Sequence, residues 1–351
     1  MPLAIEAEGL EKTFRGKREV RALDGVSFAV PEGSIFGLLG PNGSGKTTAV
    51  RILTTILRAD GGTARVLGHD VGQQPRQVRS LIGLAGQYAA VDENLTGREN
   101  LHMVGRLNHL SSSASTAAAK DLLDQFDLAD AADRTLKTYS GGMRRRLDLA
   151  AALVARPPVL FLDEPTTGLD PQSRIDLWEV IEGLVDRGTT VLLTTQYLEE
   201  ADRLASTLVV LDHGRVIAEG TAAEMKASLG ATVLAVGFAD VGDAVRTQAL
   251  LSAVGPHVPS VNGAMVELTV DDGPGSAMES LRLLDREGLR PITFTLREPS
   301  LDDVFLALTG HRTEDETDGD GTNGNGRGRR SGRRTTPEPV DLVDADSRGA
   351  S

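Results

Sequence analysis

The sequence contains no cysteine, which excludes disulfide bonds and thiolate metal sites and fits a reducing cytoplasm. It also contains no run of 18 apolar residues, so we expect no membrane-spanning helix. The first residues, "MPLAIEAEGLEKTF", lack a basic segment followed by an apolar one, which predicts that there is no signal peptide. A role at a membrane therefore requires a partner that supplies the spanning part.

Positive charge is in the minority as well. Lys and Arg total 37 against 50 Asp and Glu, which gives a formal net charge of -13 at pH 7. This balance argues against a nucleic-acid binder that relies on overall basicity, so we expect no specific nucleic-acid partner. The 351 residues, 40% of them hydrophobic, suffice for two soluble domains and a tail.

Residues 1–220 show the hydrophobic pattern of an α/β domain. Two alternating runs, "AIEAEGLEKTF" and "ALDGVSFAV", predict antiparallel strands. Short apolar runs, among them "SIFGLLG", "VLFLD" and "TTVLLTTQ", are separated by helical segments, which predicts a buried parallel sheet. We expect a mostly helical subdomain at about residues 88–156. The hairpin pattern "LVVLDHGRVIAEG" closes the domain near Gly220.

A second unit follows an expected linker at residues 221–230. Residues 231–310 carry strand and helix patterns in the order β-α-β-β-α-β, the split arrangement of ferredoxin-like modules, with Asn262-Gly263 as a hairpin signal. A last amphipathic helix follows Ser300, and we interpret it as part of this small domain and suited to docking. Residues 311–351 are acidic, then rich in Gly and Asn, then rich in Arg, which predicts a disordered tail.

The segment "GPNGSGKT" matches the phosphate-loop pattern G-x-x-x-x-G-K-[ST], and it lies between a predicted strand and a predicted helix as that chemistry requires. Its glycines let backbone N–H groups turn toward phosphate oxygens, and the helix N-terminus favours an anion. A glycine-rich turn that holds a lysine by chance is the alternative, and the flanking strand and helix disfavour it. The residues that we expect to bind ATP here are Gly40, Pro41, Asn42, Gly43, Ser44, Gly45, Lys46, Thr47 and Thr48.

Two acids follow the apolar strand "VLFL". Ligands of open α/β sheets bind at the carboxyl ends of the strands, so we expect Asp163 and Glu164 to meet the phosphate loop there. Together with Thr47, Asp163 would hold Mg²⁺. Glu164, one residue further, is expected to be the base that orients the attacking water.

Four motifs in one order, namely the phosphate loop, Gln87 in "GLAGQYAAVDENLTGREN", "YSGGMRRR" and "FLDEPTTGLD", resemble the nucleotide-binding subunit of an ABC transporter. The similarity extends over roughly Leu3 to Gly220. It implies an α/β phosphate-loop ATPase core with an antiparallel β subdomain and an inserted helical subdomain. A phosphate-loop GTPase is the weaker alternative, because no guanine-reading N-K-x-D element is visible and "YSGGM" stays unexplained.

The resemblance implies roles for residues outside the phosphate loop. Two subunits would meet head to tail, so that Ser140, Gly141 and Gly142 of one cap the γ-phosphate held by the other. An aromatic that stacks on adenine would be Phe14, although an ordinary strand residue is the alternative. Gln87 would sense Mg²⁺ and the attacking water, and Asp170 would lie across the dimer interface.

Two positions depart from the commonest family pattern. The segment "SGGM" is the signature of the family, and Met143 replaces the Gln with which this signature usually ends. Gln196 stands where a His usually contacts the γ-phosphate. Glutamine donates a hydrogen bond but cannot carry the positive charge of an imidazolium. We therefore expect modest turnover that rests mainly on Glu164, with Gln196 as an auxiliary catalytic residue.

These departures, with "TTQYLEEADRLA" and "EPSLDDVFLALTG", resemble the daunorubicin/doxorubicin-resistance branch of ABC exporter ATPases up to about Gly310. That branch implies a homodimer paired with a separate polytopic permease, peripheral at the cytoplasmic side of the membrane, that exports a hydrophobic drug or lipid-like molecule. A soluble ABC ATPase that acts on ribosomes or nucleic acid is the alternative. The single cassette and the absence of Cys disfavour it.

Overall fold

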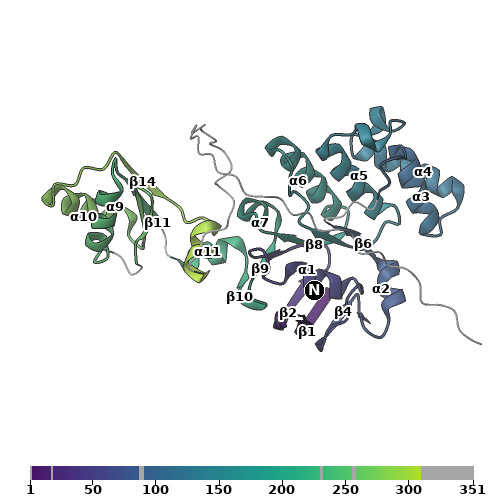
Figure 1. Ribbon diagram of the computed structural model, residues 1–351, viewed down its shortest axis with the longest axis horizontal. Helices are drawn as coiled ribbons and strands as arrows, with labels where there is room; N and C mark the ends of the chain where they lie inside the picture. Colours follow the sequence, from purple (N-terminus) through teal and green to yellow (C-terminus); the bar gives the residue numbers. More distant parts are fainter. Residues whose placement is uncertain (1, 17–18, 87–90, 230–231, 255–257, 310–351) are drawn as a thin grey trace, which may run out of the picture. The chain divides into compact units, whose positions relative to one another are not determined.

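The computed structural model describes residues 2–16, 19–86, 91–229, 232–254 and 258–309 (Figure 1). The predicted tail, residues 311–351, and the expected sensor Gln87 lie outside the described residues. Within the described ranges, no helix is long and apolar enough to cross a membrane.

A six-stranded sheet forms the centre of the first domain. Its strands, in the spatial order β10-β9-β3-β8-β7-β6, are parallel except for the β9–β10 hairpin. The buried apolar runs seen in the sequence form these strands, as expected for a sheet that is covered on both faces. Their bounds are β3 Ile35–Leu39, β6 Ile82–Ala85, β7 Val159–Asp163, β8 Thr190–Thr195, β9 Thr207–Asp212 and β10 Arg215–Gly220.

The predicted antiparallel strands are confirmed as part of a second sheet with the order β2-β1-β4-β5. Its long strands are β1 (Leu3–Arg15) and β2 (Glu19–Pro31), and its short ones are β4 (Gly61–Val66) and β5 (His69–Asp70). Helix α1 (Lys46–Leu53) follows β3, and helix α2 (Pro75–Leu81) lies between β5 and β6 in the sequence.

The helical subdomain is confirmed over its described residues. It contains α3 (Gly97–Leu107), α4 (Ser112–Gln125) and α5 (Gly141–Leu153), with 3-10 turns at Ala129–Ala131 and Leu136–Thr138. Helices α3 and α4 lie side by side (Figure 1). After strand β7 comes α6 (Pro171–Val185), and after β8 comes α7 (Leu198–Leu204).

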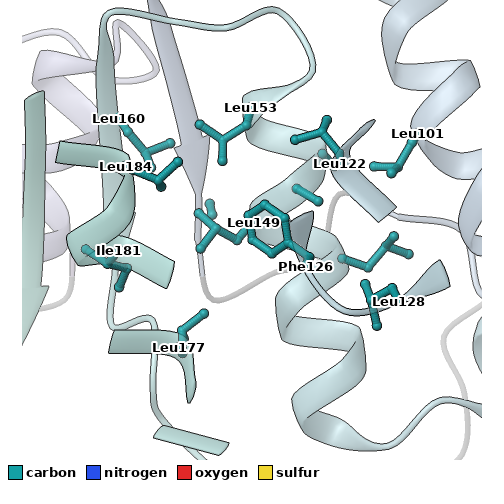
Figure 2. Packing of buried hydrophobic residues seen from close by; sticks show 14 of the residues in the cluster. Leu101, Leu122, Phe126, Leu128, Leu149, Leu153, Leu160, Leu177, Ile181 and Leu184 are labelled. Carbon is teal, nitrogen blue, oxygen red and sulfur yellow. The ribbon is translucent and has the colours of Figure 1, made fainter. Parts of the chain in front are cut away.

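One hydrophobic cluster ties this subdomain to the sheet. Figure 2 shows Leu101 of α3, Phe126 after α4, Leu149 of α5 and Leu160 of β7 within the same packed group. Alternate residues of β7 point to opposite faces of the sheet, so Leu160 joins this cluster whereas Phe161 joins a second cluster with α1. Helix α5 therefore shares a packed cluster with β7, the strand that ends in Asp163.

Residues 221–230 differ from the linker that we predicted. Helix α8 (Ala222–Ser228) lies there, and it begins with a capping box in which Thr221 and Glu224 exchange side-chain and backbone hydrogen bonds. Met225 and Leu229 are buried against the first domain. The segment thus has its own capping signal and its own apolar contacts, which a flexible linker does not need.

The small domain has the predicted β-α-β-β-α-β order. Its elements are β11 Thr232–Gly237, α9 Val241–Leu251, β12 Ser260–Asn262, β13 Met265–Val270, α10 Gly273–Arg286 and β14 Thr293–Arg297. The strand order β12-β13-β11-β14, with all neighbours antiparallel, is the ferredoxin-like arrangement. Asn262 pairs with Met265, so Gly263 occupies the hairpin turn as expected.

The last helix, α11 (Leu301–Thr309), packs differently from our prediction. Leu301, Val304 and Phe305 are buried in a cluster with residues of α7 and α8, and not with the core of the small domain. Arg297, the last residue of β14, holds the first turn of α11 by bonds of 2.6 and 2.9 Å to the Asp303 carboxylate. The apolar face that we had assigned to docking is thus covered by the same chain.

The helical cluster gives a direct test of packing. Leu101→Ala removes a fully buried side chain from α3 and should lower the free energy of unfolding by about 2–5 kcal/mol. Leu107→Ala, on the same helix but 70% exposed, should change it by less than about 0.5 kcal/mol. Urea unfolding of both variants, followed by circular dichroism, measures the difference. Equal losses would mean that α3 does not pack as described.

Candidate ATP site

The phosphate loop requires glycine at its last turn for steric reasons. Gly45, the N-cap of α1, has φ 112°, a left-handed backbone that side chains disfavour. A Cβ placed there would lie 2.5 Å from the Ala22 carbonyl oxygen of β2. The loop between β3 and α1 is therefore pressed against the antiparallel sheet. That contact fixes the direction in which α1 begins.

Lys46 is the first residue of α1 and is 4% exposed. Its ammonium donates hydrogen bonds to the carbonyl oxygens of Gly40 at 2.7 Å and Pro41 at 3.1 Å. It is also 3.5 Å from a carboxylate oxygen of Glu164. Burial lowers the pKa of Lys46, while the charges of Glu164 and Asp163 oppose that shift. The loop lysine and the second acid therefore meet, as the sequence predicts for these two motifs.

The Ser44 side chain in the same loop is buried, and its Oγ has no hydrogen-bond partner among the described residues. A buried hydroxyl without a partner is costly, so such groups commonly mark a ligand or water site. Asn42 and Gly43 are exposed at the tip of the loop, and Thr47 and Thr48 are half-buried in the first turn of α1. The unpartnered Ser44 hydroxyl, beside the N-terminus of α1, suits phosphate oxygens.

Asp163 connects the phosphate loop to the neighbouring strand. Its Oδ1 accepts hydrogen bonds from Thr47 Oγ1 at 3.2 Å and from Thr194 Oγ1 at 2.6 Å. Among the described residues there is no group of three His, Cys, Asp or Glu side chains that could hold a metal on its own. A hydroxyl beside a carboxylate nevertheless fits Mg²⁺, because this ion takes its other ligands from phosphate and water.

Glu164 has a left-handed backbone, with φ 51°, which is uncommon for a residue with a side chain. Its amide donates to both the carbonyl and the hydroxyl oxygen of Thr194, each at 3.1 Å. The residue is 9% exposed. A strained conformation held by specific bonds is a common feature of functional sites.

The signature segment begins α5, with Ser140 as N-cap accepting a bond from the Met143 amide at 3.2 Å. A Cβ at Gly141 would meet no atom within 4 Å, whereas one at Gly142 would lie 2.6 Å from Ser173 Oγ of α6. The two glycines therefore face different surroundings. Gly142 is needed for packing within the chain, and nothing described in the chain explains Gly141. Met143 packs against the helical cluster, which accounts for an apolar residue at this position.

Three other predicted residues lie on separate elements. Asp170 caps α6, and hydrogen bonds from the Ser173 hydroxyl and amide lower the pKa of its carboxyl group. Gln196 is half-buried and directly follows β8, two residues beyond Thr194. Phe14 is 43% exposed on β1, with the Lys12 ammonium 5.9 Å from its ring centre. These positions leave the roles of Phe14, Asp170 and Gln196 as predictions.

Two charged residues beside the site, one half-buried and one fully buried, are not indicated by the motifs. Arg145 of α5 donates to backbone carbonyl oxygens around Glu164, and its only sequence signal is its place in the run "MRRR". Glu200 of α7 is fully buried and accepts a hydrogen bond from Trp178 Nε1 at 3.1 Å, and burial raises its pKa. Glu200 follows Gln196 by four residues, and the sequence of α7 gives no signal that this carboxylate is buried.

Comparison with known proteins agrees with this architecture. Residues 23–167 match the ABC transporter family model, and residues 220–309 match the model of the C-terminal domain of DrrA1-3-like ATP-binding proteins. The chain is 54% identical over 317 residues to the daunorubicin/doxorubicin resistance ATP-binding protein DrrA of Streptomyces peucetius, covering 90% of this chain and 94% of that protein. It is 41% identical to the Nod factor export ATP-binding protein I of Burkholderia lata, covering 90% and 100% of the two chains.

Solved structures support the same fold. An ATP-binding cassette of an ABC transporter in its ADP conformation aligns with a TM-score of 0.57 and 27% identity, covering 64% of this chain and 93% of that chain. A dimeric cassette bound to ADP and phosphate aligns with the same TM-score at 24% identity, covering 62% and 98%. The predicted fold class, an α/β phosphate-loop ABC ATPase core, is confirmed. The chain therefore belongs to the ATP-binding subunits of ABC exporters, in the group that includes the DrrA proteins, and it is an ATPase coupled to transport.

Proposed function

We propose that two copies of the chain form a head-to-tail dimer with two composite ATP sites, and that closure of this dimer drives a separate polytopic permease. The single observation that carries the first half of each site is the contact of Lys46 with Glu164 and of Thr47 with Asp163 at one edge of the sheet. The exposed start of α5 supports the second half of each site, because Gly141 has open space around it. A helix N-terminus with a free approach suits the γ-phosphate of an ATP held by the other copy.

In this proposal each side chain has one task. The Lys46 ammonium binds the β- and γ-phosphates, and Thr47 and Asp163 hold Mg²⁺, which supplies charge neutralisation at the phosphates when bound. Glu164 accepts a proton from the attacking water. Gln196 donates a hydrogen bond toward the γ-phosphate in place of an imidazolium, so turnover depends mainly on Glu164.

The remaining assignments extend the site outward. Phe14 stacks on the adenine, Gln87 contacts Mg²⁺ and the attacking water, and Asp170 lies across the dimer interface. The exposed ring of Phe14 supports the first assignment, because an apolar ring at the surface is free to meet a base. We place the subunit at the cytoplasmic side of the cell membrane, bound to its permease. The small domain, residues 232–297, acts as an accessory part of this assembly.

We further propose that the cargo is a hydrophobic drug, an antibiotic or a lipid-like molecule. The supporting observation is similarity over most of the chain to proteins named for daunorubicin and doxorubicin resistance. The ATP-binding subunit powers the movement, and the surface that selects the cargo lies in the permease.

Glu164→Gln tests the catalytic base. The variant should bind MgATP with unchanged affinity, because the amide keeps the shape of the side chain, and should lose about 10²–10⁴-fold in hydrolysis rate. Phosphate release by the purified full-length chain measures this. Glu179→Gln, an exposed Glu on α6, is the matched control and should retain the wild-type rate. Near-wild-type hydrolysis by Glu164→Gln would show that the base is another group.

Gly141→Ala tests the second half of the composite site. The added methyl group meets no atom of its own chain, so the melting temperature should not fall. It occupies the space through which a phosphate reaches the backbone, so ATP-dependent dimerisation should weaken about tenfold or more, which corresponds to about 1.4 kcal/mol. Analytical ultracentrifugation with MgATP in the Glu164→Gln background gives the measurement. Gly183→Ala, within α6, is the control for an added methyl group on a helix.

Co-purification tests the permease. Membranes of the native host are washed in high salt, solubilised in detergent and passed over an affinity matrix that binds this subunit. A multi-span permease should be recovered in stoichiometric amount. Recovery only from the soluble fraction, with ribosomes or nucleic acid attached, would contradict the transport role and would leave the ATP site intact.

A further inference from the structure

The guanidinium of Arg145 donates hydrogen bonds to four backbone carbonyl oxygens around the proposed catalytic residue Glu164. Arg145 lies on α5, five residues after the cap Ser140, and its side chain is 15% exposed. Its guanidinium reaches two separate segments. The carbonyl oxygens that it binds are those of Gly86 at 2.6 Å, Asp163 at 3.4 Å, Glu164 at 3.0 Å and Pro165 at 2.6 Å.

These bonds hold the carbonyl end of Glu164, whereas Thr194 holds its amide end. The amide of Glu164 donates to Thr194, and its carbonyl accepts from Arg145. The carbonyls before and after it accept from the same guanidinium. The left-handed backbone of Glu164, at φ 51°, is therefore held at both ends of the residue. The direction of its carboxylate depends on that backbone.

The charge of Arg145 is matched within the fold. Burial lowers the pKa of the guanidinium, and the carboxylate of Asp148, 3.5 Å away and 3% exposed, opposes the shift most strongly. An arginine stays protonated in proteins, so its bonds to the carbonyl oxygens are charge-assisted. The two neighbouring arginines have other partners. Arg144 donates to the Glu93 carboxylate and to the Lys137 carbonyl oxygen, and Arg146 lies 3.9 Å from the exposed Asp127. Arg144 also lines the cleft beside Glu164, whereas Arg145 donates to the backbone carbonyl oxygens of residues 163–165.

A cleft of about 400 Å³ runs beside this side chain. Gly141 at the start of α5, Glu164, and residues 167–169 before Asp170 line it together with Arg145. The guanidinium thus lies between the helix that begins with the signature and the loop that carries the catalytic acid. Gly86, its fourth partner, directly precedes Gln87 in the chain.

We propose that Arg145 is a positioning residue for ATP hydrolysis: it touches no nucleotide, and it sets the direction of the Glu164 carboxylate by holding the backbone at residues 163–165 and at Gly86. The proposal rests on the role proposed above for Glu164. An arginine is required, because a lysine ammonium presents three donors at one point and cannot span the two segments.

The test compares Arg145→Gln and Arg145→Lys with wild type in the purified full-length chain. A misplacement of about 1 Å at a reacting group costs on the order of 10²-fold, so kcat of Arg145→Gln should fall by about that factor. The KM for MgATP should change less than about threefold, because the phosphate loop is untouched. Arg145→Lys should lie between Arg145→Gln and wild type. Arg156→Gln, at an 83% exposed side chain just after α5, is the control and should keep the wild-type kcat.

A double variant separates positioning from general damage. If Arg145 acts through Glu164, Arg145→Gln combined with Glu164→Gln should be no slower than Glu164→Gln alone, since the group being positioned is already absent. Losses that multiply would overturn the proposal. So would a kcat of Arg145→Gln within twofold of wild type, or a fall in kcat matched by an equal rise in KM. Wild-type hydrolysis by Glu164→Gln alone would instead refute the proposed base.

Hydrogen exchange gives a readout that does not depend on turnover. In Arg145→Gln, amides of peptides that cover residues 163–166 should exchange faster, while peptides of α3 and α4 should keep their wild-type protection. Unchanged exchange at 163–166 would show that Arg145 does not hold this backbone. Faster exchange throughout the chain would show a loss of global stability instead of a local one.

Discussion

The parallel pairing of β3, β8, β7 and β6 is the constraint on which the rest of the site depends. Parallel strands place their carboxyl ends at one edge, so the segments that follow them begin side by side although they are far apart in the sequence. The phosphate loop follows β3, Gln196 follows β8, and Asp163 ends β7 with Glu164 directly after it. Since β8 lies between the other two, Thr194 can bind Asp163 and the amide of Glu164 at once.

Buried polar groups at this edge exchange hydrogen bonds across elements. Lys46 binds carbonyls of its own loop, Asp163 accepts from two threonines, and Arg145 spans two strand ends. Each buried charge would be costly alone, and each is matched by a partner from a different element. In the proposed dimer, α5 and Glu164 of one chain serve two different ATP molecules. The guanidinium of Arg145 therefore joins parts of both composite sites within a single chain.

The motifs predicted that the phosphate loop and the two acids meet at this edge, because the chemistry of these motifs is local. A strand followed by "GPNGSGKT" constrains backbone and helix together, and four apolar residues before Asp163 indicate a buried strand end. The buried parallel sheet and the ferredoxin-like order of the small domain followed from hydrophobic periodicity, whereas the ABC core with its inserted helical subdomain came from the family resemblance. Arg145 and Glu200 could not be found from pattern alone, because in the sequence they are charges on amphipathic helices. Only the packing of α5 and α7 turns these side chains inward.

The errors lay where two distant segments meet. Residues 221–230 contain a clear capping box, "TAAE", yet the segment is short, and only contact with α7 and α11 gives Met225 and Leu229 a place to be buried. Likewise, the amphipathic pattern of α11 indicates an apolar face without telling which surface covers it. Hydrophobic periodicity indicates that one face of a helix is buried, but it does not indicate which other element covers that face.

Helices α8 and α11 lie at the entry and the exit of the small domain, and both are buried in the same cluster of the first domain. Residues 232–297 are therefore connected as an insertion, even though they lie near the end of the sequence. Both ends of this insertion lead into the cluster formed by α7, α8 and α11, which serves as its anchor. Shortening the chain from its C-terminus would strip α11 from α7 and α8 before it reached the small domain. An internal excision that joins the end of α8 to Ser300 would be the cleaner way to separate the two parts, because it leaves that anchor in place.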